Sequence, residues 1–378
     1  MSISVADEWM CHQTVSTFDH VENSDPQWAK RVWLAAFEKT GKFVFGFGMG
    51  KYTNRNVMDA SLCIAVDGKT QYNLRASRVL FPDIETYKIG PMAYEIAEPL
   101  KSVRVIAGEN DHGIRCDLLF MGETEIYEQT PSMFRRRNGR LINHMIRFFQ
   151  TGSVEGWIEE GVCHEVRREE WWASRDRSWG LRSNTGEFVT SDGISSNLLG
   201  GMQPPGEGVT YRWSYFTMQF PNWNTSFEFA QTPEGKRLGP ALGHLQHARH
   251  TGLKDQKIIN VDHYWDFMPG SDFRLRGIRS IVHLDDGSTK ELKMEPIGFC
   301  LRRPGGGGGS YAGYQGWAQG IWKGSLWVDG DKTDLTDEAI IKELHFTDDC
   351  ALKITCDGEQ GWGLSEPLIP GIAELLTT

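Results

Sequence analysis

Large hydrophobic residues alternate with small or polar residues along most of this chain, and short turns rich in glycine and aspartate separate the runs. Alternation with a period of two is typical of strands that bury one face. Residues 61–66 and 70–77, on either side of Asp67-Gly68, predict a hairpin. Similar runs continue from residue 87 to residue 166. The pattern therefore predicts consecutive antiparallel strands, as in a barrel or sandwich.

The same pattern resumes in the second half of the chain, where residues 211–220 place large aromatic side chains on one strand face. Residues 141–150 and 154–158 predict another hairpin, which turns at Gly152. Only residues 336–342 predict a helix, with Thr336 as its N-cap and two acidic residues in its first turn.

A segment rich in glycine, serine, asparagine and proline, residues 192–208, divides the two strand series and predicts a linker. The expected organisation is a lead-in segment over residues 1–27, a first β domain over residues 28–191, and a second over residues 209–378. The fold class is then all-β, with two antiparallel barrel-like domains packed together and few short helices.

Composition narrows the range of partners. The net charge of −10 argues against nucleic acids and anionic membranes. No apolar run approaches the length of a membrane span, and the first residues lack the apolar core of a signal peptide. Seven cysteines at irregular spacings predict reduced thiols in a cytoplasmic protein. The 14 tryptophans, 10 tyrosines and 19 phenylalanines are enough to line a large apolar site.

Residues 171–182, Trp-Trp-Ala-Ser-Arg-Asp-Arg-Ser-Trp-Gly-Leu-Arg, combine more charges and indoles than any other segment. On a strand, Trp172 and Asp176 share one face, and Arg175, Arg177 and Trp179 share the other. A carboxylate among tryptophans is a candidate for an altered pKa and for catalysis. The structural alternative is a clamp, in which arginines stack on indoles and one buried aspartate pairs with an arginine.

Three other patterns suggest chemistry that we do not expect here. His244, His247 and His250 have a spacing that separates the rings on a helix and alternates their faces on a strand, so no metal site is predicted. The glycines of residues 305–309 lack the Gly-Lys-Ser/Thr ending of a phosphate loop. The acidic pairs at residues 159–160, 169–170 and 348–349 are expected to be solvated surface.

The central segment resembles the signature of a two-domain lipocalin-like family that includes the carotenoid 1,2-hydratases, also called hydroxyneurosporene synthases, and relatives without assigned function. Residues 54–59, residues 75–78 leading to Gly90-Pro91, and residues 147–158 are similar to the same uncharacterised branch. The resemblance implies two calycin-type barrels with a ligand site near their junction. It also implies that Asp176 is the acid. Ser174 stands where relatives often carry His or Gly, so the resemblance supplies no second acid–base group.

The resulting hypothesis is a cofactor-independent hydratase, dehydratase or double-bond isomerase that acts on a hydrophobic terpenoid- or steroid-like molecule. A non-catalytic carrier of apolar ligands and a carbohydrate-binding β-protein are the alternatives, and a homo-oligomer remains an open option. The candidate residues are Asp176 as catalytic acid, Arg175, Arg177 and Arg182 as supporting groups, and Trp172, Trp179, Tyr211, Trp213 and Tyr215 as substrate-binding walls.

Overall fold

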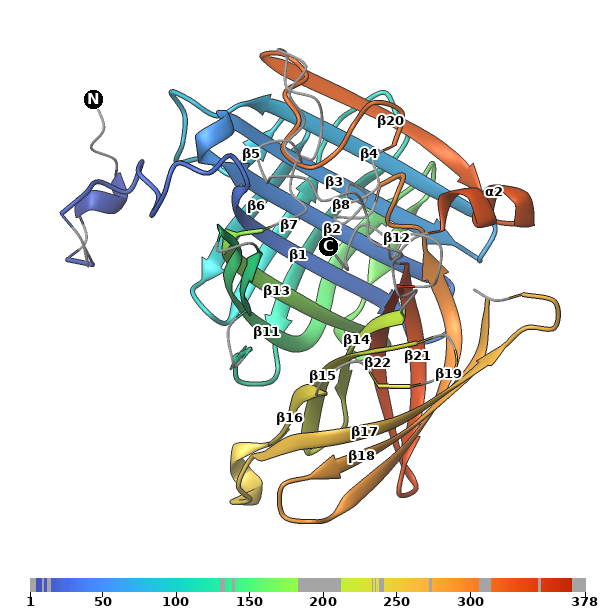
Figure 1. Ribbon diagram of the computed structural model, residues 1–378. Coiled ribbons are helices and arrows are strands. Elements are labelled where there is room, and N and C mark those ends of the chain that lie inside the picture. The colour runs from blue at the N-terminus through green and yellow to red at the C-terminus, as the bar shows by residue number, and fades with distance from the viewer. Residues whose placement is uncertain are drawn as a thin grey trace.

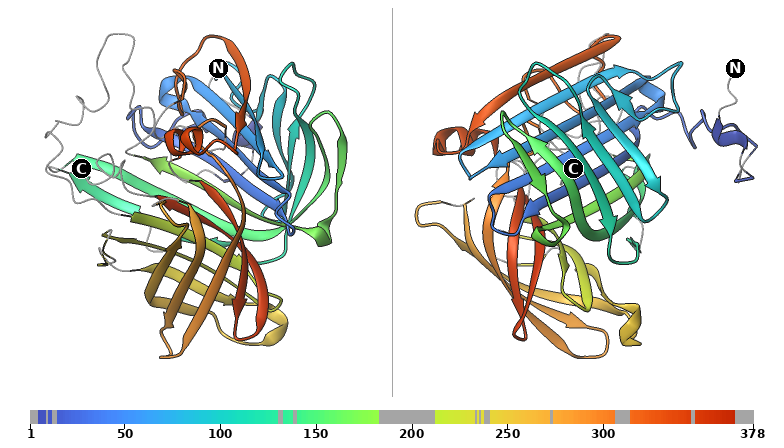
Figure 2. Two further views of the ribbon diagram at one scale, coloured as in Figure 1. Left: turned by 90° about the vertical axis from the view of Figure 1, so that its right-hand side faces the viewer. Right: turned by 180° about the vertical axis from the view of Figure 1, so that it is seen from behind.

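The computed structural model describes residues 5–8, 10–11, 15–129, 133–137, 140–182, 212–232, 234, 236–237, 241–271, 274–305, 314–345 and 348–368. These residues form two bodies of antiparallel strands, one above the other in Figure 1 and again in Figure 2. The predicted all-β class with two barrel-like sheets is confirmed. The predicted linker, residues 192–208, lies outside the described residues.

The chain forms its elements in a simple order. The first half contains β1 (Trp28–Glu38), β2 (Phe43–Tyr52), β3 (Val57–Val66), β4 (Thr70–Val79), β5 (Lys88–Ile89), β6 (Met92–Glu98), β7 (Ser102–Ala107), β8 (Arg115–Gly122), β9 (Tyr127–Glu128), β10 (Met133–Arg137), β11 (Arg140–Glu159), β12 (Cys163–Val166) and β13 (Trp171–Leu181). The second half contains β14 (Arg212–Gln219), β15 (Trp223–Gln231), β16 (Leu242–His247), β17 (Gln256–Phe267), β18 (Leu275–Leu284), β19 (Thr289–Cys300), β20 (Leu326–Asp334), α2 (Glu338–Leu344), β21 (Asp349–Cys356) and β22 (Glu359–Leu368). Short 3-10 turns are η1 (Val5–Glu8), η2 (Thr53–Arg55), η3 (Arg168–Glu170) and η4 (Arg249–Thr251).

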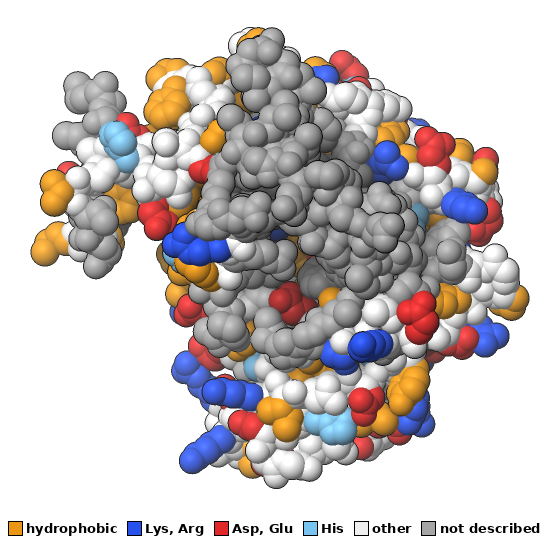
Figure 3. Space-filling view, viewed as in Figure 1, with side chains coloured by type: hydrophobic (Ala, Val, Ile, Leu, Met, Phe, Trp, Pro, Cys, Tyr) orange, Lys and Arg blue, Asp and Glu red, His pale blue; other side chains and the backbone are white. Residues whose placement is uncertain are grey.

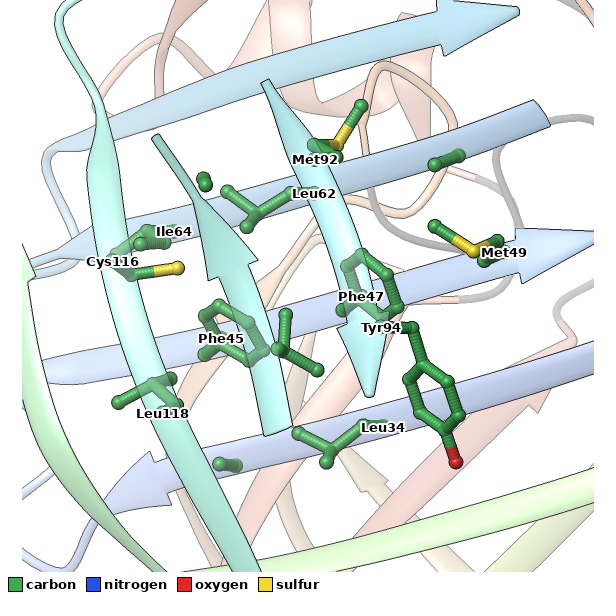
Figure 4. Packing of buried hydrophobic residues seen from close by; sticks show 14 of the residues in the cluster. Leu34, Phe45, Phe47, Met49, Leu62, Ile64, Met92, Tyr94, Cys116 and Leu118 are labelled. Carbon is green, nitrogen blue, oxygen red and sulfur yellow. The ribbon is translucent and has the colours of Figure 1, made fainter. Parts of the chain in front are cut away.

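The first sheet curls into a nearly closed barrel with strand order β20-β4-β3-β2-β1-β13-β11-β8-β7-β6-β5. Strands β6 to β8 cross over β1 to β3, and the side chains of both layers meet between them (Figure 4). Phe45, Phe47 and Leu118 are among the fully buried side chains of this core. Burial of such side chains is the main stabilising term of the barrel.

The second sheet is a closed barrel of eight strands in the order β14-β15-β16-β17-β18-β19-β21-β22. Its interior is filled mainly by aromatic and aliphatic side chains, such as Phe216, Phe227 and Ile354. Closure removes the free sheet edges that would otherwise invite pairing with another chain.

Strand β20 leaves the second body and pairs with β4 at the edge of the first sheet, so residues 212–368 contribute to both sheets. Arg75 on β4 is only 1% exposed, and its Nη2 lies 2.8 Å from Asp329 Oδ2 and 2.9 Å from Asp331 Oδ2. The same guanidinium donates to the carbonyl of Pro304. These contacts tie β20 to the first sheet. The sequence could not reveal them, because the partners lie more than two hundred residues apart.

The two bodies meet through the outer face of the first sheet. Trp33, Phe37 and Trp172 from this face form a buried apolar cluster with Leu364 of β22 and Ile341 of α2. An antiparallel sheet commonly leaves one face in water. Here the middle strands of the first sheet are covered on both faces.

Two details of the sequence-based prediction are wrong. The expected hairpin at Gly152 is instead one continuous strand, β11. A Cβ at Gly152 would lie only 2.0 Å from the carbonyl oxygen of Met121. Glycine at this position allows the neighbouring strand to approach closely, and the chain does not turn there. The helix begins at Glu338 and its N-cap is Asp337, whose carboxylate accepts from the backbone of Ala339 and Ile340. Thr336 lies one residue too early to cap it.

The seven cysteines are all free thiols. Among the helices of the described residues, none is long and apolar enough to span a membrane. On the face shown in Figure 3, acidic and basic side chains of the described residues are interspersed.

Replacing Arg75 with Met is expected to lower the free energy of unfolding by about 2–4 kcal/mol, because it removes a buried guanidinium from two carboxylates and a carbonyl. We place the loss below that of a fully buried pair because Asp329 and Asp331 are 39% and 27% exposed. Chemical denaturation measures the change. Arg104→Met, which removes an exposed ion pair with Asp117, is the matched control and should cost less than about 1 kcal/mol. Equal losses in both variants would contradict the role of Arg75.

Candidate functional site

Strand β13 lies between β1 and β11 in the first sheet, and its side chains alternate as the sequence predicted. On the outer face, Trp172 packs in the cluster between the bodies, and Ser174 Oγ lies 3.5 Å from Thr217 Oγ1 of β14. On the inner face, the Arg175 guanidinium lies 5.3 Å from the centre of the Phe120 ring inside the first barrel. Asp176 therefore faces the second barrel, while the arginines beside it in sequence do not.

Asp176 is partly exposed, with 18% of its side chain accessible, and it lies between Trp33 of β1 and Phe149 of β11. Its Oδ2 is 3.9 Å from Nε of Arg147, which projects from β11 on the same face. The Phe149 ring stacks on Tyr215 of β14 with 4.8 Å between the ring centres. Asp176 and Tyr215 thus lie at one point of the junction.

Tyr215 is flanked on the second barrel by two acidic residues, since its register partners are Glu228 on β15 and Glu366 on β22. Its hydroxyl accepts a hydrogen bond of 3.0 Å from Ser226 Oγ. Burial raises the pKa of Tyr215 well above its usual value, and the charges of Asp176 and Glu366 oppose ionisation further. Tyr215 therefore keeps its proton at neutral pH.

Among the described residues of this part of the junction, carboxyl groups outnumber cations. Burial raises the pKa of Glu228, although Arg147 opposes the shift. Burial also raises the pKa of Asp349 well above its ordinary value. Arg302 partly neutralises this group, with Nη1 3.5 Å from Asp349 Oδ1, and forms an ion pair with Glu366. A desolvated acid that keeps its proton is a proton donor.

The acidic pair Asp348-Asp349 was expected to be solvated surface, and this prediction is wrong. Asp348 is 7% exposed and Asp349 is 0% exposed. Asp349 begins β21 and lies over the first sheet, where Oδ2 comes within 3.1 Å of the place a Cβ on Gly46 would occupy. A charge pattern read from sequence cannot show that a second body covers the strand.

Four further residues of the junction were not predicted from the sequence: Arg147, Glu228, Arg302 and Glu366. Only Glu228 carries a local signal. It stands between Phe227 and Phe229, which point into the second barrel, so strand alternation puts a lone carboxyl on the outer face. The other three depend on strand pairings that join distant parts of the chain.

The remaining predicted residues are distributed differently. Trp179 points with Arg177 into the first barrel, away from Asp176, and its ring centre is 5.7 Å from the Arg177 guanidinium. Arg182 follows the end of β13, where its backbone N–H donates to Gln27 over 3.3 Å. Trp213 belongs to β14, but its side chain lies outside the described part of the chain, as does the whole of Tyr211.

An open groove of about 390 Å³ lies between the bodies at the Trp172 end of β13. Aromatic and charged side chains share its lining, among them Lys39, Arg168, Trp171, Trp172, Phe220 and Trp362. Trp172 and Asp176 are four residues apart on one strand face, which separates them by about 13 Å. The groove and Asp176 thus occupy different places along the same junction.

The three histidines of the H-x-x-H-x-x-H pattern have separate surroundings. His244 is buried against Tyr127, and burial lowers its pKa to about 3. His247 contacts Gln256 at 3.4 Å, and His250 contacts Asn222 at 3.0 Å. Within the described ranges, no group of three or more His, Cys, Asp or Glu side chains is arranged to hold a metal ion.

One protein-family model matches nearly the full length of the chain. A family model described as a family of unknown function, DUF8625, matches residues 3–374. The chain belongs to this family. The comparison with curated proteins finds no match.

Solved structures give a likeness in fold. A candidate AttH from Nitrosomonas europaea has a TM-score of 0.53 at 12% identity, with 90% of this chain and 92% of that chain covered. CghA bound to Sch210972 has a TM-score of 0.48 at 10% identity, covering 91% and 89%. Kievitone hydratase from Nectria haematococca has a TM-score of 0.44 at 11% identity, covering 93% and 93%. The likeness to the candidate AttH, at 12% identity, concerns the fold alone, and the other two TM-scores are below 0.5 and support no further conclusion.

Replacing Glu228 with Gln is expected to flatten the dependence of stability on pH. The raised pKa of Glu228 means that its stabilising contribution is complete below the unfolded pKa of about 4.3 and is lost as pH rises through the folded value. Without this titrating group, the slope of the unfolding free energy against pH should change by at most about 1.4 kcal/mol per pH unit. Urea unfolding between about pH 5 and pH 8 measures it.

Glu291→Gln serves as the control of opposite sign. The hydrogen bond from Arg279 lowers the pKa of exposed Glu291, so its contribution is present at higher pH and is lost as pH falls. A Glu228→Gln profile parallel to that of the wild type would show that Glu228 is ionised in the folded protein.

Proposed function

We propose that this protein is a cofactor-independent hydratase, dehydratase or double-bond isomerase that acts on a hydrophobic terpenoid- or steroid-like molecule at the junction of its two bodies. The observation that carries the proposal is the position of Asp176. It is a partly exposed carboxyl group on an otherwise buried face, next to the protonated hydroxyl of Tyr215 and to further carboxyl groups.

The proposed chemistry needs one proton donor and an apolar wall. The carboxylic acid of Asp176 gives its proton to one alkene carbon, so that a C–H bond forms and the π bond breaks. Aromatic rings can stabilise the cation left on the other carbon, and Phe149 and Trp33 are the aromatic register neighbours of Asp176. Addition of water, which returns a proton to the carboxylate, gives hydration. Transfer of a neighbouring C–H proton to the same carboxylate, with the C–H electron pair forming a new π bond, gives isomerisation. Dehydration is the reverse of the first route.

The surrounding carboxyl groups support this role. Glu228 and Glu366 flank Tyr215, and burial favours the neutral form of Glu228. A buried carboxyl group with a raised pKa near Tyr215 favours acid chemistry in this part of the junction.

Arg175 and Arg177 act in this proposal as positioning residues, because both project from the opposite face of β13. Arg175 Nε donates to Gln150 Oε1 of β11 over 2.9 Å. Arg177 Nη1 donates to the Arg31 carbonyl of β1 over 3.2 Å. These bonds fasten β13 to its two neighbours and so fix where Asp176 points. The resemblance of residues 171–182 to the hydratase signature supports the same assignment.

A second candidate function is binding without catalysis. The open groove beside Trp172 and Trp362 combines indole faces with charged and amide groups, which suits a carbohydrate or a flat polar ligand. In that case the groove would be the functional site, and Asp176 would be a structural partner of Arg147.

Asp176→Asn is expected to reduce turnover by about 10²–10⁴-fold, the usual contribution of a general acid, with little change in ligand affinity. Suitable test compounds are lycopene as an alkene, linalool as a tertiary alcohol and a Δ5-3-ketosteroid, with label from heavy water followed in the products. Asp266→Asn, which removes an exposed acid on the second barrel, is the control and should turn over normally.

Thermal melting of the same variants separates the two roles of Asp176. A structural ion pair with Arg147 predicts that Asp176→Asn melts early, whereas Asp176→Glu, which keeps the acid, retains stability and some turnover. A stable, ligand-binding Asp176→Asn protein with full turnover would remove Asp176 from the mechanism.

A further inference from the structure

One end of the first barrel, which we call the barrel mouth, carries a group of cations on its inner face. Strand register places Lys51, Lys30 and Trp179 on one rung across β2, β1 and β13. Arg177 lies on the next rung inward, and Arg175 lies one rung deeper. Because alternate residues share a face, all five side chains are directed toward the barrel interior.

These cations contact carbonyl groups and rings in place of carboxylates. Lys51 donates to the Ile84 carbonyl, and its Nζ lies 4.1 Å from the centre of the Tyr87 ring. Arg177 donates to two backbone carbonyls and covers Trp179. Across the parts of the chain that the structure describes, Lys30, Lys51 and Arg177 form no ion pair.

Asp83 is the carboxylate whose charge raises the pKa of Lys51, but this carboxylate already pairs with Arg78. Its Oδ2 lies 3.3 Å from Nη2 of Arg78, and it accepts hydrogen bonds from Thr86. Arg78 is held in turn by the carbonyls of the same loop. The loop therefore satisfies Arg78 and leaves Lys30, Lys51 and Arg177 without an anionic partner.

This arrangement of like charges is electrostatically unfavourable. Lys30 and Lys51 are register partners on adjacent antiparallel strands, where like charges repel. Burial lowers the pKa of Lys51 to about 8, and the charges of Lys30, Arg78 and Arg177 act in the same direction. Burial and Arg177 also lower the pKa of Lys30. Buried charges in proteins are normally paired, and an oxyanion placed among these groups would compensate their charge.

The walls next to the cations are aromatic. Tyr94 is buried and stacks on Phe47 with 6.3 Å between ring centres and 4° between planes. Its ring stands between the two layers of the barrel near Leu34 (Figure 4). Tyr87 and Trp179 are 40% and 37% exposed, so large apolar surfaces border the positive charges at the barrel mouth.

We propose that this end of the first barrel is a second binding site, which holds the oxyanion of a small amphiphilic molecule between Lys30, Lys51 and Arg177. The anion is a carboxylate or a phosphate, and its apolar chain lies against Tyr87 and Trp179. The site is separate from the junction, because Arg177 and Asp176 project from opposite faces of β13. Simple surface lysines do not account for it, since these side chains are directed into a barrel that is lined by aromatic rings.

Calorimetric titration of the full chain tests the proposal with four probes below their micelle concentrations: laurate, dodecyl phosphate, acetate and inorganic phosphate. The two amphiphiles should bind, and the one that binds more tightly identifies the anion. Lys30→Met and Lys51→Met keep the aliphatic stem and should each weaken binding roughly tenfold to a hundredfold, as expected for losing one charge-assisted hydrogen bond. Lys293→Met, which removes an exposed lysine from the second barrel, is the matched control and should bind normally.

Two further readouts test the charges themselves, one without ligand and one with laurate. Without ligand, Lys51→Met should melt at a temperature equal to or above that of the wild type, because repulsion is relieved. Affinity of the wild type for laurate should fall as pH rises through about 8, where Lys51 loses its proton. Binding that is unchanged in both lysine variants, no binding of either amphiphile, or binding of inorganic phosphate alone would each overturn the proposal. The binding result is independent of the Asp176→Asn test, so either proposal can fail while the other stands.

Discussion

Burial of both faces of the first sheet is the constraint on which the rest of the structure depends. Nine of the ten residues of β2 are buried, although an antiparallel strand with one solvated face would bury about half. The inner face closes around its own apolar core, and the second barrel covers the outer face. Glycines on β2 make room for that cover, as Asp349 shows by its approach to Gly46. The two bodies therefore stabilise one another through a layer that neither completes alone.

Polar groups trapped in this layer need partners, and their arrangement connects stability with chemistry. Some of these groups form ion pairs, and the pairs of Arg75 with Asp329 and Asp331 hold β20 against the first sheet. Where the described carboxyl groups outnumber the described cations, as around Tyr215, burial raises the pKa of acids such as Glu228 and Asp349. The proposed catalytic chemistry draws on that second situation.

Strand β13 belongs to both proposed sites. Its outer face carries Asp176 at the junction, and its inner face carries Arg177 beside the lysines of the barrel mouth. A strand alternates with a period of two, so one short segment can serve two environments of opposite charge. A shift of register by one residue would exchange the two sets and destroy both.

The sequence by itself determined the fold class and the faces of β13, because both follow from local alternation and turn residues. It also identified Asp176 and Tyr215 as residues of one region. It did not find Arg147, Glu366 or Asp349, and it misread Gly152 as a turn. These features depend on which strand pairs with which and on what covers the outer face of the sheet. Register across hundreds of residues and burial by a second body leave no local pattern, so only the tertiary structure decided them.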